Sequence, residues 1–367
     1  HVAAVLLSVQ VLGQTVLGFD LSIAQILLTL GLCAAIDIPM TMWDERRIAW
    51  PASALLTGNG IALLLRTPGT EHGDWWSLNG WPMFMAAAFI AVLSKYAIRV
   101  GRRHVFNPSN LGLVIVFLVF GAAYADPQEL WWGPWRPGLV ATVVLIVAGG
   151  VTLALRMRLF DVVVAFWSTF AVGIAVVALA GHAMVARWSL VPVEGLEYWT
   201  ILITSPEIII FAFFMITDPP TSPDSRNARL AYGVGIGALA ALLSATQTTE
   251  FGTKVSLLAA LTVLCAFRPA LERRGRPHIV QERLAPRRAA LVGVTAVAWV
   301  ALLWVLPALV EPTLARTPGA AVDVAAAGDR RPDVASAEVP EATVRDNVAR
   351  EAAVDTDLAD TIAQDTL

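Results

Sequence analysis

The chain has 367 residues, of which 57% are hydrophobic and only 15% charged, and its mean hydropathy is +0.65. Soluble globular domains carry about 25% charged residues, so this composition excludes a conventional soluble enzyme and indicates a membrane protein with several spans. The net charge of −3 gives no indication of nucleic-acid binding, and the expected surrounding is a lipid bilayer.

Eleven apolar windows follow one another along the chain, and a helix needs roughly 20 mainly apolar residues to cross a membrane. They lie near 2–17, 21–40, 49–65, 81–98, 108–125, 137–155, 160–181, 198–217, 229–245, 254–268 and 289–310. The sequence therefore predicts an all-α integral membrane protein with 10–11 transmembrane helices in a domain over residues 1–311. The third window contains Thr57, Gly58, Asn59 and Gly60, so we expect it to be broken or re-entrant.

Lysines and arginines accumulate in every second loop. Examples are Arg46 and Arg47 after the second window, and seven arginines from Arg268 to Arg288 after the tenth. The positive-inside rule then places the N-terminus and these loops in the cytoplasm, as in a plasma-membrane protein. The chain opens on His1 without a basic region before the first window, so we expect a processed or truncated start rather than a signal peptide.

The segment 312–367 differs from the rest of the chain. It holds 11 acidic and 5 basic residues and very few aromatic ones, a composition typical of disorder. If all eleven windows span, this acidic tail lies outside the cell.

Conventional catalytic and metal-binding patterns are missing from the sequence. Cys33 and Cys265 fall in separate apolar windows, and the five histidines are scattered. Neither a disulfide framework nor a metal site is expected, and no residue is assigned as catalytic.

A polar stretch, "GRRHVFNPSN" at residues 101–110, interrupts two apolar runs. Pro108 suits the first turn of a helix and Asn107 suits its N-cap. Arg102 and Arg103 fit the positive-inside pattern. Helix capping explains every residue type here, and a binding site at the helix start is the alternative.

A second interruption covers residues 204–229. Asp218 ends an apolar stretch on the same side of the membrane, where Lys95 or an arginine could pair with it. Glu207 lies about ten residues earlier, near mid-bilayer, where an ionisable group costs about 2.5–3.5 kcal/mol. Glu207 is either a neutral acid bonded to a neighbouring helix or part of an ion or proton pathway. Asp37, near the cytoplasmic end of its window, is a second candidate for such a pathway.

Two motifs carry a resemblance to a known family. "GRRHVFNPSNLG" (101–112) and "FFMITDPPTSP" (213–223) resemble signatures of the RnfD/NqrB family, membrane subunits of sodium- or proton-coupled electron-transfer complexes. "EFGTKVSLLAALTVLCAFRPALE" (250–272) resembles the family's penultimate loop and last helix, so the likeness covers about 85–275. It implies two structural repeats.

Two other stretches, "DPQELWWGPWRPGL" and "TSPEIIIFAFFMITDP", carry a closer likeness: they are similar to sequences of the enediyne biosynthesis membrane proteins called UnbU. It implies a place in a secondary-metabolite locus.

The RnfD/NqrB resemblance implies a flavin, FMN or riboflavin, beside the Asn-Pro signature. His104 and Asn107 occupy the positions that approach riboflavin in the family. The expected surroundings of the flavin comprise Arg102, Arg103, His104, Phe106, Asn107, Asn110, Thr217 and Asp218. The family's threonine motif for covalent FMN does not occur between residues 125 and 205, so we expect noncovalent binding. Thr246, in "SATQTT" (244–249), follows the second signature and is expected to cap a helix.

Three functions remain open at this point. The first is a flavin-binding subunit of membrane electron transfer, served by redox partner subunits or biosynthetic oxidoreductases. The second is a transporter for export or self-protection, with its pathway lined by residues 57–60, Pro206, Glu207 and the glycine run 233–237. The third is a scaffold subunit without a ligand.

Overall fold

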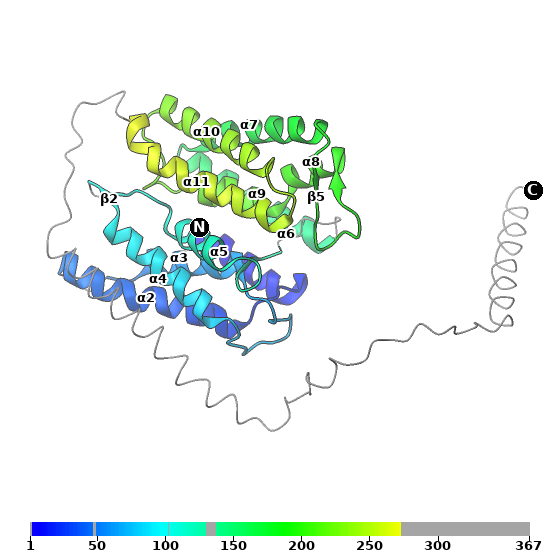
Figure 1. Ribbon diagram of the computed structural model, residues 1–367. Coiled ribbons are helices and arrows are strands. Elements are labelled where there is room, and N and C mark those ends of the chain that lie inside the picture. The colour runs from blue at the N-terminus through cyan, green and yellow to red at the C-terminus, as the bar shows by residue number, and fades with distance from the viewer. Residues whose placement is uncertain (1, 47–48, 102, 130–136, 273–367) are drawn as a thin grey trace, which may run out of the picture. The chain divides into compact units, whose positions relative to one another are not determined.

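The computed structural model describes residues 2–46, 49–101, 103–129 and 137–272 (Figure 1). The window 289–310 and the tail 312–367 lie outside the described residues. Within the described part, six helices are long and apolar enough to cross a membrane and four shorter apolar helices accompany them. Strands form only short two-stranded pairs there. The predicted all-α membrane fold is therefore confirmed.

The described helices follow the predicted windows in order. They are α1 (Val2–Leu12) with the π-helical turn η1 (Gly13–Leu17), α2 (Ile23–Glu45), α3 (Ala52–Leu64), α4 (Trp81–Ala97), α5 (Pro108–Phe120), α6 (Pro137–Arg156), α7 (Phe160–Leu179), α8 (Gly195–Thr204), α9 (Pro206–Ile210) with the π-helical turn η2 (Phe211–Met215), α10 (Arg226–Ser244) and α11 (Glu250–Glu272). The strand pairs are β1 (Leu65–Arg66) with β4 (Asp126–Pro127), β2 (Arg99–Val100) with β3 (Arg103–His104), and β5 (Ala183–Met184) with β6 (Val193–Glu194).

The predicted break in the third window is wrong, because α3 is a continuous helix through residues 57–60. Its Gly58 serves packing instead. A Cβ on Gly58 would lie 3.1 Å from the backbone of Leu30 in α2. Small residues at such a crossing let two membrane helices approach closely, which offsets the weaker helix propensity of glycine.

The interrupted helix is the eighth window. α8 ends at Thr204 and α9 begins at Pro206, with the Ser205 hydroxyl accepting the backbone N–H of Ile208 as an N-cap. The π-helical turn η2 follows at once, and π-turns inside helices frequently mark functional sites. Glu207 thus lies in the first turn of a half-helix within the candidate span Gly195–Met215.

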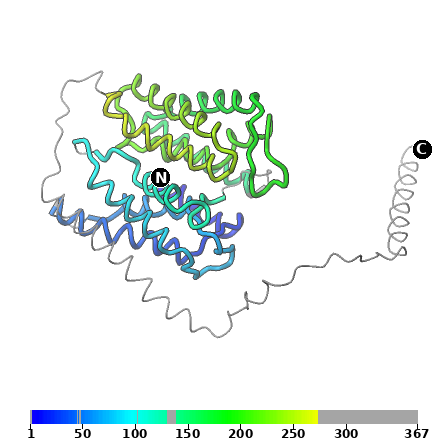
Figure 2. Tube along the Cα trace, in the orientation of Figure 1, coloured from blue at the N-terminus to red at the C-terminus, as the bar shows by residue number. Residues whose placement is uncertain are grey.

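Glycines also set the packing of α10 on α7, which run side by side in Figures 1 and 2. A Cβ on Gly233 would lie 2.6 Å from the carbonyl oxygen of Val162, and one on Gly237 would lie 2.7 Å from that of Phe166. The glycine run 233–237 therefore brings two helices together. Close packing therefore accounts for Gly233 and Gly237 without a transport pathway.

The N-terminal end of α5 is built as predicted. The Asn107 side-chain oxygen accepts the backbone N–H of Asn110, and Pro108 occupies the first turn. Asn110 in turn donates to the carbonyl oxygen of Leu258 and to the Thr262 hydroxyl, both on α11. Because α5 has 13 residues, or about 20 Å at 1.5 Å per residue, its two ends reach different regions of the protein.

Candidate functional site

A cavity of about 370 Å³, which we call the signature cavity, lies at the start of α5 and brings the two sequence signatures together. Its polar lining comes from Ser53, Thr57, His104, Asn107, Ser109, Thr217 and Asp218. Its apolar lining includes Leu6, Leu56, Leu63, Leu64, Leu153, Met157, Ile210, Phe214 and Met215. The cavity therefore combines apolar walls with a few polar side chains from α3 and from the two signatures, the arrangement common in small-molecule sites.

Hydrogen bonds fix the polar edge of the signature cavity. His104 Nε2 lies 3.4 Å from Asp218 Oδ2, which also accepts the Thr221 hydroxyl at 3.0 Å. Asn107 Nδ2 donates to the Met215 carbonyl oxygen at 3.2 Å. The side chain of Asn107 therefore joins the first signature to the second and caps α5. His104, Thr217 and Asp218 also line the cavity, and of these the Thr217 hydroxyl already donates to the Phe213 carbonyl oxygen.

The other predicted flavin residues are placed differently. Arg103 pairs with Asp224 at 2.9 Å and is partly exposed. Phe106 packs against the hydrophobic core, and Asn110 is bonded to α11. Arg103, Phe106 and Asn110 do not line the signature cavity, and Arg102 lies outside the described residues.

Thr246 is remote from the signature cavity. It follows the C-terminal end of α10, whereas the N-terminal end of that helix comes directly after the second signature. With 19 residues, α10 is about 28 Å long. The Thr246 hydroxyl donates to the Leu243 carbonyl oxygen at 2.7 Å.

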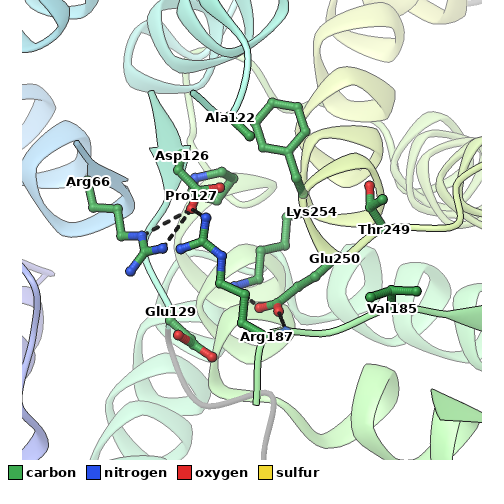
Figure 3. A pocket seen from close by; sticks show the side chains of 11 residues that line it. Arg66, Ala122, Asp126, Pro127, Glu129, Val185, Arg187, Thr249, Glu250 and Lys254 are labelled. Atoms are coloured by element: carbon green, nitrogen blue, oxygen red, sulfur yellow. Dashed lines mark hydrogen bonds and ion pairs between the residues drawn. The ribbon is translucent and has the colours of Figure 1, made fainter. Parts of the chain in front are cut away.

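A second cavity, of about 410 Å³, lies beyond the other end of α5, and we call it the charged cavity (Figure 3). Its charged lining residues are Arg66, Asp126, Glu129, Arg187, Glu250 and Lys254. Asp126 accepts Arg66 at 2.9 Å and Arg187 at 2.6 Å, and Arg66 also contacts Asp20 at 2.7 Å. Sequence reasoning missed this cavity, since its charged lining residues come from four separate segments.

Glu207 is held by a buried lysine. Lys254 Nζ lies 2.9 Å from Glu207 Oε1 and 2.7 Å from Glu250 Oε1. The three side chains are 6%, 10% and 8% exposed for Lys254, Glu207 and Glu250. Glu207 is thus bonded to a neighbouring helix, as one alternative held, but its partner is a cation. The i, i+4 spacing of Glu250 and Lys254 in an apolar stretch was the available signal.

Burial raises the pKa of two acids that line the charged cavity. Loss of hydration raises the pKa of Asp126 above its usual range, against the opposing charge of Arg66. Loss of hydration also raises the pKa of Glu129, and the negative charge of Glu250 adds to the effect. Both carboxyls therefore hold a proton to higher pH than an exposed acid does.

Asp37 belongs to a third polar group, apart from the cavities. It lies 2.8 Å from Lys95 Nζ and accepts the Tyr96 hydroxyl at 2.6 Å. Lys95 therefore pairs with Asp37, so of the two partners that the sequence offered for Asp218, Lys95 or an arginine, Lys95 does not fill that place. Asp218 lies against His104 instead.

Comparison with known proteins gives one family match. Residues 125–279 match the model of the NQR2, RnfD, RnfE family. The match includes the second signature and α11, while the first signature lies before it. Comparison with curated proteins gave no match. The matched region relates this multi-pass membrane protein to the RnfD/NqrB-like membrane subunits.

Proposed function

We propose that the signature cavity binds the ring system of a noncovalent flavin, FMN or riboflavin, and that the protein is a membrane subunit of an electron-transfer complex. One observation carries this proposal. His104 and Asp218, 114 residues apart in sequence and each within a signature, lie in contact on one cavity. The match of residues 125–279 to the NQR2, RnfD, RnfE family model supports the assignment as an electron-transfer membrane subunit.

The cavity is suited to an isoalloxazine ring by size and by lining. Its volume of about 370 Å³ is within the range of about 300–1,000 Å³ typical of small-molecule sites. The aromatic Phe214 and the polar His104 and Thr217 are all among its lining residues. A flavin has the same division, with an apolar dimethylbenzene side and a polar pyrimidine side.

Each residue then has a defined role. His104 bonds a polar atom of the ring, and Asp218 orients the imidazole through the contact at 3.4 Å. Asn107 holds the two signatures together through the Met215 carbonyl. A bound flavin supplies one- and two-electron transfer. The chain has two cysteines, fewer than the four thiolates of a common iron–sulfur cluster, so the electrons come from partner subunits.

The test is an absorption and fluorescence spectrum of the purified protein before and after denaturation in SDS. Flavin that SDS releases supports the proposal, and His104→Ala and Thr217→Val should then lose it while Thr246→Val keeps it. Flavin that stays on the denatured chain refutes noncovalent binding. A folded protein that lacks flavin, and stays empty when FMN and riboflavin are added, refutes the cofactor.

Transport on the same fold is the second candidate function, with export or self-protection as its purpose. The observation that favours it is the buried Glu207–Lys254 pair at 2.9 Å within a candidate span, since intramembrane charges commonly mark transport pathways. Substrate uptake into proteoliposomes that contain flavin-free protein would favour this candidate over a scaffold subunit.

The likeness to enediyne biosynthesis proteins supports a narrower proposal, in which a biosynthetic oxidoreductase supplies the electrons. Deletion of the gene from its host should then stop formation of an oxidised secondary metabolite and leave respiration intact. Loss of respiration instead would place the protein in a general electron-transfer complex.

A further inference from the structure

We propose that Gln10 on α1 and Asn59 on α3 bind a hydroxylated chain of the ligand in the signature cavity, which in a flavin is the ribityl chain. The inference rests on the proposed flavin and adds two binding residues from outside both signatures. It concerns the side of the cavity that α1 and α3 provide.

The first argument is the lack of hydrogen bonds on these two amides. Gln10 is 5% exposed and Asn59 is 3% exposed. Among the described residues, neither the amide nitrogen nor the carbonyl oxygen of either side chain has a hydrogen-bond partner. Other buried amides in the described part, such as those of Asn110 and Gln128, lack a partner for the oxygen alone. All four polar atoms of Gln10 and Asn59 are therefore available to a ligand.

Burial inside a membrane protein makes such amides costly. A buried amide without a hydrogen bond destabilises the folded state, and lipid supplies no donor or acceptor in place of water. Nearly all buried polar side chains of native proteins are therefore satisfied by protein, water or a ligand. Leucine has nearly the shape of asparagine and would avoid the cost. Two such amides on helices that pack together, α1 and α3, indicate that a bound group completes them.

The second argument is the position of the amides along the cavity wall. Residues three or four apart on a helix share a face. Asn59 lies between Leu56 and Leu63 on α3, and both leucines line the cavity. Gln10 lies one turn beyond Leu6, a lining residue on α1. Neither amide is itself a lining residue, so each lies beside the cavity, and a change of rotamer turns it inward.

α3 also contributes two hydroxyls to the cavity, those of Ser53 and Thr57. The Thr57 hydroxyl donates to the Ser53 backbone carbonyl at 2.9 Å, and its oxygen stays an acceptor. Ser53 and Asn59 are about 9 Å apart along the helix axis at 1.5 Å per residue. The α3 side of the cavity therefore offers hydrogen bonds over the length of a short polyol chain.

The donors and acceptors of the two amides select hydroxyl groups as partners. A primary amide donates through its N–H groups and accepts through its carbonyl oxygen. A carboxylate or phosphate accepts only and leaves the carbonyl oxygens unpaired, whereas an ammonium donates only and leaves the N–H groups unpaired. A hydroxyl does both. The described residues that line the cavity include neither lysine nor arginine to balance an anion, so a neutral polyol chain fits best.

The cavity then holds a flavin from two sides. The ring lies against His104 and Thr217 of the signatures, and the ribityl hydroxyls lie against Gln10 and Asn59. These two amides therefore set the preference for a flavin that carries a hydroxylated chain over one that lacks it.

The first experiment compares riboflavin with lumiflavin, which has the same ring but a methyl group in place of the ribityl chain. The full-length protein is purified in detergent, freed of flavin and titrated with each compound while flavin fluorescence is followed. We expect the wild type to bind riboflavin at least about tenfold more tightly, the effect of one or two hydrogen bonds. Asn59→Leu and Gln10→Leu should each reduce this preference several-fold and leave the affinity for lumiflavin unchanged.

The second experiment measures unfolding of the flavin-free variants in SDS. Because the two amides have no described partners to lose, Asn59→Leu and Gln10→Leu should be at least as stable as the wild type. Gln25→Leu is the matched control. Gln25 is fully buried, donates to the Thr70 hydroxyl at 2.9 Å and accepts the Ser22 backbone N–H at 2.9 Å. This control should lose stability and keep the preference for riboflavin.

The outcomes separate this inference from the cofactor itself. A folded wild type that binds neither compound refutes the flavin and the inference together. Equal binding of both compounds by the wild type, or leucine variants that both retain the preference, keeps the flavin and refutes the role of Gln10 and Asn59. Leucine variants that are destabilised as much as Gln25→Leu, or that do not fold, show that the amides have protein partners and also refute it.

Discussion

Replacement of Lys254 by methionine should destabilise the protein strongly. Methionine keeps most of the volume of the side chain but leaves Glu207 and Glu250 without their shared cation. The lysine and both acids are at most 10% exposed, so little solvent screening reduces the effect. Removal of one partner of a buried ion pair typically costs about 3–5 kcal/mol, and we expect a loss of unfolding free energy of this size.

The assay is equilibrium unfolding by SDS in mixed micelles, followed by the fluorescence of the 13 tryptophans. Arg103→Met is the matched control, because Arg103 and Asp224 form a pair that is 42% and 73% exposed; a surface pair of this kind contributes about 0–1 kcal/mol. The double variant Glu207→Gln with Lys254→Met should recover part of the loss, because it leaves one buried carboxylate fewer.

Two outcomes would refute this reasoning. In the first, Lys254→Met unfolds within about 1 kcal/mol of the wild type, like the surface control. In the second, the added Glu207→Gln substitution deepens the loss instead of relieving it.

Three further predictions concern pH, packing and sidedness. Burial raises the pKa of Glu129 in the folded protein. The protonated carboxyl therefore stabilises the folded protein at low pH, and this stabilisation is lost as pH rises above the ordinary pKa of 4.5 and through the folded pKa. Glu129→Gln should flatten this decline of the unfolding free energy with pH, and an unchanged pH profile would contradict the prediction. Gly112→Ala should lower the unfolding free energy by about 1–3 kcal/mol through overpacking, because the new Cβ would clash with a backbone oxygen of α4. Gly31→Ala is the control and should not destabilise the protein, because nothing lies within 4 Å of its Cβ. A cysteine replacing the exposed Asp224 should react with a membrane-impermeant maleimide only from the cytoplasm and one replacing Thr246 only from outside; reversed labelling would invert the topology.

Local sequence features predicted much of the fold. The apolar windows gave the order of the helices, because burial in a bilayer imposes a length of about 20 apolar residues on each span. Asn107 and Pro108 gave the start of α5, because an N-cap depends only on the next three residues. The resemblance of the two signatures to the RnfD/NqrB family pointed to His104, Asn107, Thr217 and Asp218, which line the signature cavity, but also to Arg103, Phe106 and Asn110, which do not.

Only the tertiary structure decided which polar groups meet. His104 contacts Asp218 across 114 residues, and Glu207 contacts a lysine on another helix. These pairings depend on how helices pack, and helix packing depends on close approaches such as that of Gly58 to α2, which no local pattern encodes. The same glycine looked like a helix breaker in sequence, because propensity is local, whereas the packing energy that overrides it comes from a segment far away in the chain.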